Sequence, residues 1–163
     1  CIFKNCNFSE FNLSGYKFLD FDFVDCNLSL AKLNDTVFRE IRFTDCKMLG
    51  LQFERCNTFG LVFSFLNCQL NHSSFFQLTL RKTVFNECQL REIDFSEADL
   101  NSSKFIDCDL SQSVFQNTDL ENADLTSSYN YSIDPENNRL KGAKFSLSGI
   151  YGLLDKYQIK IEN

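Results

Sequence analysis

The sequence predicts an all-β protein in which the chain winds through square coils of twenty residues that stack as a solenoid. Three observations carry this prediction. An apolar residue, mostly Phe or Leu, recurs at every fifth position from Phe3 to Leu125 with few interruptions. A small or apolar residue usually precedes each of these centres by two positions, as Cys6 precedes Phe8. Cysteine itself recurs at intervals of twenty. An α-helix has a period of 3.6 and a flat strand a period of two, so neither gives a five-residue repeat. A period that persists along a chain is instead typical of a stacked-repeat architecture.

Each five-residue unit is expected to point two side chains inward and three outward. The centre and the residue two before it are apolar or small, whereas the other three are mostly Asn, Asp, Ser, Lys, Glu or Gln. Four such units close one square coil. Successive coils then pair as short parallel strands about 4.8 Å apart.

The cysteines provide a check on this register. Two series are spaced by twenty, but the gap between Cys46 and Cys68 is twenty-two, and Phe63 to Leu70 is seven rather than five. Thr58 is a further lapse among the centres. We predict a two-residue bulge within residues 64–67 that brings six cysteines into one interior column: Cys6, Cys26, Cys46, Cys68, Cys88 and Cys108.

The column cysteines are expected to be buried free thiols. Side chains stacked in parallel one coil apart fit poorly to the dihedral angle of a disulfide. A zinc site is not expected either, since the chain has no C-x-x-C pair and a single His. Reduced cysteines favour a cytoplasmic protein.

Several units carry a resemblance to a known family. Residues 98–102 (ADLNS) and 123–127 (ADLTS) read A-D-L-x-x, and residues 26–30 (CNLSL) and 108–112 (CDLSQ) are a C-(N/D)-L variant. The chain resembles the pentapeptide-repeat family, whose fold is a right-handed quadrilateral β-helix. The resemblance implies that fold for residues 1–128. The chain begins inside a repeat and without Met, so we expect that N-terminal residues are missing.

The five-residue period ends after Leu125. Residues 129–146, with the only Pro, are expected to form a loop and a last partial coil. Residues 147–163 are expected to form a short helix and strand. Ile150, Leu153, Leu154 and Tyr157 fall on one helix face, and residues 158–162 alternate like a strand.

This C-terminal module has two possible roles. It is either only a lid over the open end of the solenoid, or it joins two chains end to end. The order of the segments resembles the C-terminus of Qnr-type and MfpA-type quinolone-resistance proteins, which implies a two-fold homodimer. The resemblance implies that dimerisation uses Ile150, Leu153, Leu154, Tyr157, Ile159 and Ile161.

The charge of the chain is concentrated in one segment. The whole chain has a net charge of −6, while residues 91–125 contain nine acidic and two basic residues. The candidate partner-binding carboxylates lie there: Asp94, Glu97, Asp99, Asp107, Asp109, Asp119, Glu121 and Asp124. Either the A-D-L repeat favours Asp before each centre and the acidity is a by-product, or rows of carboxylates bind a basic groove. An acidic surface argues against direct binding of nucleic acid, whose phosphates require Lys and Arg.

Catalysis has little support in the sequence. There is no nucleophile-elbow, zinc-protease or phosphate-loop motif, and the only His, His72, is expected to face solvent at a coil corner. We therefore expect no enzyme activity, no cofactor, no metal and no membrane span. The resemblance implies a DNA mimic that binds a bacterial type II topoisomerase such as DNA gyrase and modulates quinolone sensitivity. The alternative is a protein-interaction scaffold with an unrelated partner. Several Qnr proteins project long loops from the rod, and this chain is expected to lack such loops. MfpA-type rods also lack them.

Overall fold

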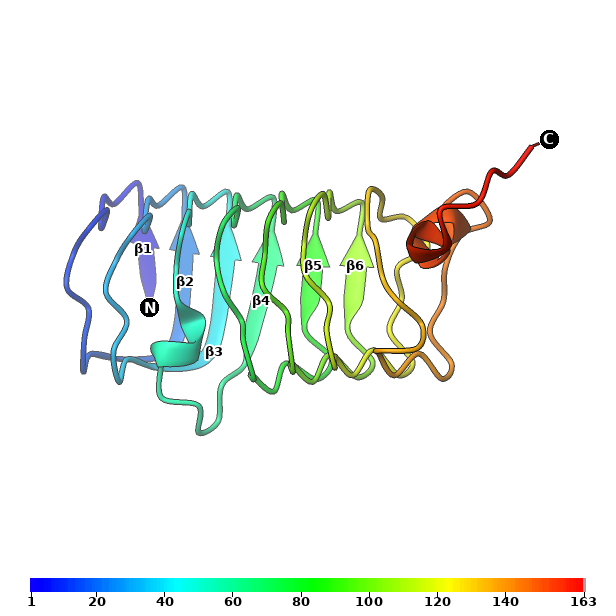
Figure 1. The fold of residues 1–163 in the computed structure, drawn as a ribbon. Coiled ribbons are helices and arrows are strands. Elements are labelled where there is room, and N and C mark those ends of the chain that lie inside the picture. Colours follow the sequence, from blue (N-terminus) through cyan, green and yellow to red (C-terminus); the bar gives the residue numbers. More distant parts are fainter. Residues whose placement is uncertain (163) are drawn as a thin grey trace.

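The computed structural model describes residues 1–162, and the chain forms the predicted right-handed quadrilateral β-helix, drawn out as a rod (Figure 1). One wall of the rod is a parallel sheet in which six strands follow one another in chain order. The strands are β1 (Ile2–Lys4), β2 (Lys17–Val24), β3 (Val37–Thr44), β4 (Phe63–Leu66), β5 (Val84–Asn86) and β6 (Lys104–Ile106). On the other three walls most pairings are isolated parallel bridges, such as Asp99 with Asp119, although β2 and β3 also pair on the wall that precedes the sheet, as Phe18 does with Phe38.

We number the four faces in chain order within a coil. Face 1 carries the sheet and is centred on Phe85, face 2 on Leu90, face 3 on Phe95 and face 4 on Leu100. Bridged residues are twenty apart on every face of the later coils, as in the pairing of Phe85 with Phe105. Residues twenty apart in the sequence are therefore direct neighbours in space.

The interior is a set of stacked rings. Phe95 is fully buried, and its ring centroid lies 5.4 Å from that of Phe75 and 5.2 Å from that of Phe115. It also meets the rings of Phe85 and Phe105 edge-on. Equivalent Phe residues of successive coils therefore stack on one another on face 3.

The cysteine column is confirmed as free thiols. All eight cysteines are unbridged, and all of the column members except Cys6 are buried. Their thiols point at backbone carbonyls, for example Cys46 Sγ at Phe23 O (3.3 Å) and Cys108 Sγ at Phe85 O (3.4 Å). Cys6 is only half-buried because it lies in the end coil.

The two-residue slip lies in a different place from the one predicted. Val37 still pairs with Asn57, twenty residues on, but Ile41 pairs with Phe63, twenty-two on. The extra residues therefore lie in the loop 58–62, which follows a 3₁₀ turn, η1 (Phe53–Arg55), and projects from the rod (Figure 1). The prediction of a bulge within 64–67 was wrong because Phe63 and Phe65 are both apolar. Phe65, not Phe63, is the centre that pairs with Phe43.

The C-terminal module differs from the predicted helix and strand. Residues 147–157 contain two 3₁₀ turns, η2 (Ile150–Leu153) and η3 (Asp155–Tyr157), and no strand forms at 158–162. Gly152 explains part of the difference, because its carbonyl accepts a hydrogen bond from the Ile133 N–H (2.9 Å) and a Cβ there would collide with the Tyr131 carbonyl. Gln158 has a positive φ and ends η3, and residues 159–162 then leave the rod (Figure 1), so they have no neighbouring strand with which to pair.

Residues 1–162 contain neither a membrane-spanning helix nor a grouped set of metal-ligating side chains. Among these residues, no helix has both the length and the apolar character needed to cross a bilayer. The same residues contain no group of three or more His, Cys, Asp or Glu side chains arranged to hold a metal ion.

Candidate protein-interaction surfaces

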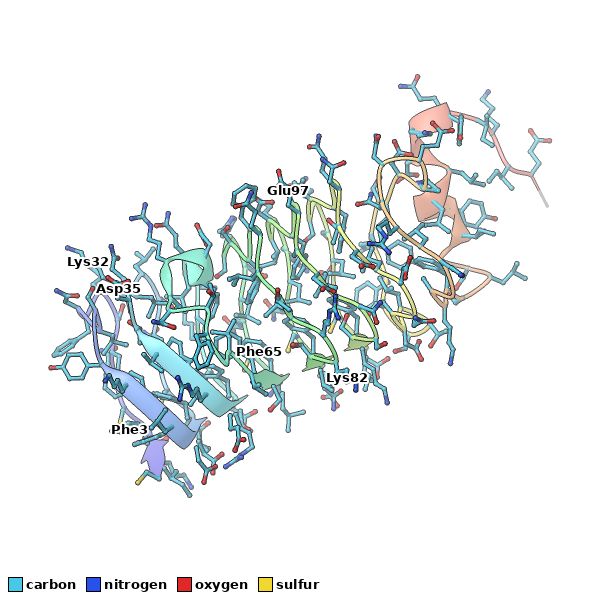
Figure 2. All side chains as sticks on the ribbon, turned by 90° about the horizontal axis from the view of Figure 1, so that it is seen from below. Phe3, Lys32, Asp35, Phe65, Lys82 and Glu97 are labelled. Carbon is cyan, nitrogen blue, oxygen red and sulfur yellow. The ribbon has the colours of Figure 1, made fainter. Side chains whose placement is uncertain are left out.

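The eight candidate carboxylates do not share one face. Asp124 lies on face 1, Asp109 on face 2 and Asp94 on face 3, as their bridges to Lys104, Gln89 and Ser74 show. Asp99, Asp119 and Glu121 lie on face 4, and Asp107 and Glu97 lie at corners. Outward side chains cover the rod all round, with Lys82 and Glu97 at opposite edges in Figure 2. The acidic segment of the sequence therefore surrounds the rod instead of forming one surface.

Four of these carboxylates are paired with arginines. Arg81 Nε lies 2.5 Å from Asp99, and Arg91 Nε lies 2.6 Å from Asp109. Arg139 bridges Asp119 (3.4 Å) and Glu121 (2.8 Å). Each pair links neighbouring coils, so these carboxylates are partly neutralised before any partner binds.

The Asp before each centre also has a local structural role. Asp94 accepts a hydrogen bond from the Ser96 N–H (2.9 Å), and Asp124 accepts one from the Thr126 N–H (3.1 Å). Asp99, Asp109 and Asp119 bond the backbone amide two residues on in the same way. Such Asx turns stabilise a tight bend, which explains why the repeat favours Asp or Asn at this position.

Asp109 is the most strongly perturbed of the eight. Burial alone would raise its pKa, but hydrogen bonds from Ser111, Asn130 and Arg91 outweigh burial and lower the pKa to about 2. Hydrogen bonds from Thr126 likewise lower the pKa of Asp124. Both carboxylates are held in the charged form by the rod itself.

A different set of carboxylates forms a row along the corner between faces 1 and 2. Its four members are exposed and occupy the same position in different coils, each with positive φ. None of them makes an ion pair with Lys or Arg within residues 1–162. Asn67 interrupts the row and donates to Asp45 (2.6 Å). We call this set the corner row: Asp25, Asp45, Glu87 and Asp107.

Sequence reasoning named only Asp107 from the corner row. A sum of charge along the sequence draws attention to residues 91–125, because their acidic residues are close together in the chain. The corner row instead takes one residue from each of several coils. A signal was available, because each member directly precedes a column cysteine, as in Asp25-Cys26 and Glu87-Cys88.

The predicted dimerisation residues divide into two groups. Ile150, Tyr157, Ile159 and Ile161 are exposed. Leu153 and Leu154 are half-buried, and Leu153 packs against the rod's core. The module thus packs on the core of the rod through Leu153 and leaves four apolar or aromatic side chains exposed.

Ion pairs fix the module to the preceding loop. Lys156 Nζ lies 2.7 Å from Asp134 and 2.6 Å from Glu136, which raises the pKa of Lys156. The Tyr157 hydroxyl donates to Glu136 (2.8 Å).

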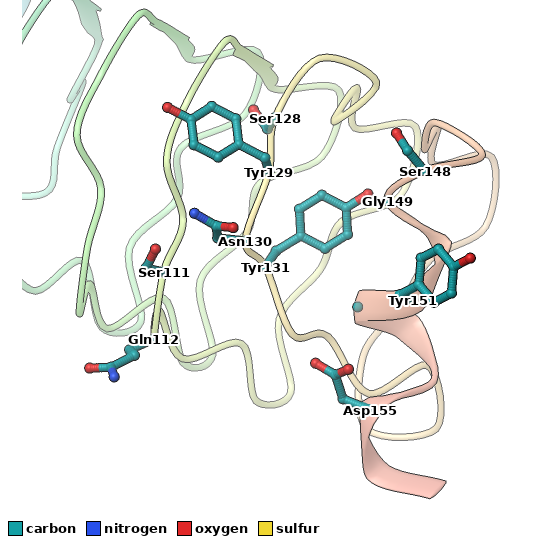
Figure 3. Close-up of a pocket in the computed structure, with 11 residues that line it drawn as sticks. Ser111, Gln112, Ser128, Tyr129, Asn130, Tyr131, Ser148, Gly149, Tyr151 and Asp155 are labelled. Atoms are coloured by element: carbon teal, nitrogen blue, oxygen red, sulfur yellow. The ribbon is translucent and has the colours of Figure 1, made fainter. Parts of the chain in front are cut away.

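A hollow of about 560 Å³ lies at the joint between the rod and the module (Figure 3). Tyr129, Tyr131, Tyr151 and Asp155 are among its lining residues. Tyr131 is buried, which raises its pKa, and its hydroxyl has no hydrogen-bond partner within residues 1–162. Its ring packs 5.7 Å from that of Phe145. Tyr131 therefore serves mainly to seat the module on the last partial coil.

His72 is exposed at a corner, as the sequence predicts, and its Nδ1 lies 3.2 Å from Glu92. It lines none of the hollows described here.

Comparison with solved structures identifies the same architecture. A structure of a trypsin-treated variant of QnrB1, described as a plasmid-mediated fluoroquinolone resistance protein, matches with a TM-score of 0.67 and 21% identity. The match covers 99% of this chain and 89% of that one. A structure of a second trypsin-treated QnrB1 variant matches with a TM-score of 0.54 and 24% identity over 99% and 88% of the two chains. At these identities the likeness concerns the fold.

Sequence comparison gives the family. A search of curated proteins returns no match. The family model described as a pentapeptide repeat region matches residues 1–64 and 52–125, which together are most of the chain. The five-residue units, the square coils and this match agree, and the chain belongs to the pentapeptide-repeat family.

Proposed function

We propose that this protein is a non-enzymatic DNA mimic that binds a bacterial type II topoisomerase, DNA gyrase or a relative, and modulates its sensitivity to quinolones. The observation that carries the proposal is the corner row of exposed carboxylates, which make no ion pair with Lys or Arg within the described residues. The likeness to QnrB1, described as a fluoroquinolone resistance protein, supports the choice of partner.

The corner row has a spacing suited to a DNA-binding groove. Neighbouring coils are about 4.8 Å apart, and one DNA strand carries a phosphate about every 3.4 Å of helix axis. Asp25 and Asp45 are one coil apart, as are Glu87 and Asp107, and Asn67 separates the two pairs. A basic groove that binds DNA would therefore meet a line of negative charges, spaced by one coil within each pair and by two coils across Asn67.

The C-terminal module extends this surface in the proposed assembly. Ile150, Tyr157, Ile159 and Ile161 of the module are exposed. We propose that they join two copies about a two-fold axis, which places two corner rows on one longer rod. A longer rod fits the groove of a two-fold symmetric enzyme better than a single copy does.

The second candidate is a scaffold for an unrelated partner. It is favoured by the Asx turns and arginine pairs, which give six of the eight sequence-predicted carboxylates a structural reason to be acidic. The two candidates differ in whether the corner row is needed for activity.

A gyrase supercoiling assay, with and without a quinolone, separates them. The test variant carries Asp25→Asn, Asp45→Asn, Glu87→Gln and Asp107→Asn. The matched control carries Glu10→Gln, Asp35→Asn, Glu40→Gln and Glu92→Gln, which are exposed residues with positive φ at the other corners.

We expect the parent and the control to change quinolone inhibition and the corner-row variant to lose this effect. The effect should also weaken as salt rises. Equal activity of the two variants would reject the corner row as the binding surface. No effect of the parent on any type II topoisomerase would favour the scaffold.

A further inference from the structure

The ladder between two coils is interrupted at one place on face 3. On this face Asn12 bridges Lys32, and Gln52 bridges Ser74, but no bridge joins Lys32 to Gln52. The 3₁₀ turn η1 causes the break, because the Gln52 carbonyl accepts the Arg55 N–H (3.2 Å) within the turn. The backbone pairing between the coil of residues 21–40 and the coil of residues 41–62 is therefore missing at this point.

Two backbone amides lose their partners at this break. The amide of Leu13 donates to the Lys32 carbonyl (2.9 Å), and Phe53 donates to Ser74 (2.9 Å), but the equivalent Leu33 amide has no partner within residues 1–162. The Gln52 amide also has none, although Lys32 and Ser74, its counterparts, donate to Phe11 and Leu51. Backbone donors without protein partners need another acceptor.

A surface hollow of about 370 Å³ lies at the break. Its polar lining consists of Lys32, Asn34, Gln52 and Arg55, and its apolar lining includes Leu30 and Leu33. Lys32 is seen at the surface of the N-terminal part of the rod in Figure 2. Every polar side chain in this lining can donate hydrogen bonds, and none of them is a carboxylate.

The two positively charged side chains that line the hollow are available to bind an anion. Neither Lys32 nor Arg55 makes an ion pair within the described residues. Glu54, next to Arg55, does not line the hollow. Its carboxylate instead repels the charged form of the Cys56 thiol. The pKa of Cys56 is raised to about 12, first by burial and secondly by Glu54. Two cations and two backbone donors therefore meet at one cavity of a chain with a net charge of −6.

We propose that this hollow is an oxyanion site that binds the carboxylate of an Asp or Glu side chain in an acidic segment of a partner protein. Arginine presents a planar fork that matches a carboxylate, and backbone N–H groups suit an anion at the closed end of the hollow. Leu30, exposed at the rim, provides apolar contact for the residue beside that carboxylate. The site is separate from the corner row and opposite to it in charge, so its test does not involve a topoisomerase.

The test is an NMR titration of the ¹⁵N-labelled full chain, which follows the Leu33 and Gln52 amides and the Arg55 Nε–H. Three probes are added at constant ionic strength: acetyl-Leu-Glu-Leu-Glu-amide, the same peptide with Gln in place of Glu, and inorganic phosphate. We expect saturable shifts at all three reporters with the Glu peptide, and none with the Gln peptide. Phosphate should compete with the Glu peptide only weakly.

Matched variants locate the binding site. K32Q/R55Q should lower the affinity for the Glu peptide about tenfold or more, since hydrogen bonds to charged groups are lost. K82Q/K141Q removes the same charge from two exposed lysines elsewhere and should leave affinity unchanged. Equal weakening in both variants, or no response of the Leu33 amide to the Glu peptide, would overturn the site. Tighter binding of phosphate than of the peptide would overturn the assignment to a partner's carboxylate.

Discussion

The ring of Phe63 packs 5.7 Å from the ring of Phe38, in the position that Thr58 fails to fill. Thr58 aligns with Phe38 in the repeat but is exposed, because the chain leaves the wall of the rod at loop 58–62. Phe63 enters the space from the next wall and also meets Phe53 at 5.3 Å. The core thus stays filled where the repeat is broken.

The first prediction concerns Phe63, whose ring fills the space that Thr58 leaves. Phe63→Ala should destabilise the protein by about 3–5 kcal/mol, because it leaves a cavity that Thr58 cannot fill. Phe59→Ala, in the same loop but 75% exposed, should change stability by less than about 0.5 kcal/mol. Urea unfolding of both variants measures the difference. A similar cost for the two would mean that Phe63 is not part of the core.

The second prediction concerns the thiols. Brief alkylation of the native protein should modify the exposed Cys1 and, more slowly, Cys6, and should leave Cys26, Cys88 and the other buried cysteines unmodified. Cys88→Ser should cost roughly 1–3 kcal/mol, since a more polar group is buried in the same site. Peptide mass spectrometry after alkylation tests the order of reaction. Early modification of Cys88 would contradict its burial.

The third prediction is a pH dependence that depends on Asp109. Its pKa in the folded protein is lowered to about 2, below that of the unfolded chain. A lowered folded pKa gives stability that is complete above the unfolded pKa, near 4, and is lost as the pH falls toward about 2. Asp109→Asn should therefore cost roughly 2 kcal/mol at pH 6 and much less at pH 2.5. Unfolding curves at the two pH values provide the comparison, and an unchanged cost would show that ionisation of Asp109 does not stabilise the fold.

The fourth prediction separates the lid from the dimer. Ile159 and Ile161 are exposed on the segment that leaves the rod, so changing both to Asp should abolish a dimer without changing the melting temperature of the rod. Leu153→Asp should lower the melting temperature, because Leu153 packs on the core. Sedimentation velocity at micromolar concentration reports the mass. A monomeric parent would leave the module with the role of a lid alone.

Much of the fold could be predicted because the repeat imposes one environment on equivalent positions. The five-residue period predicted the inward-facing centres and the cysteine column. It did not locate the slip, since Phe63 and Phe65 both satisfy an apolar pattern and only the pairing of Ile41 with Phe63 distinguishes them. The pattern of Ile150, Leu153, Leu154 and Tyr157 also fits successive 3₁₀ turns, which the close approach of Gly152 to Tyr131 favours.

The interaction surfaces were less predictable for a geometric reason. Asp99 and Asp109 are close in the sequence but lie on different faces, whereas Asp25 and Asp107 are distant in the sequence and lie along one corner. The unpaired amides at Leu33 and Gln52 depend on the path of the backbone at η1, and the repeat pattern of the side chains carries no information about that path.

The positive φ at the corners has a consequence for how such a rod can diversify. Asp, Asn, Glu and Ser all occupy these corners in this chain, at Asp107, Asn117, Glu97 and Ser102 among others. Their side chains point away from the stacked rings, so exchanging one for another alters the outer edge and leaves the interior unchanged. Rods with identical interiors can thus carry different sequences of charged and neutral residues along an edge, each separated by one coil. Selection for a new partner can act on that sequence of charges one residue at a time.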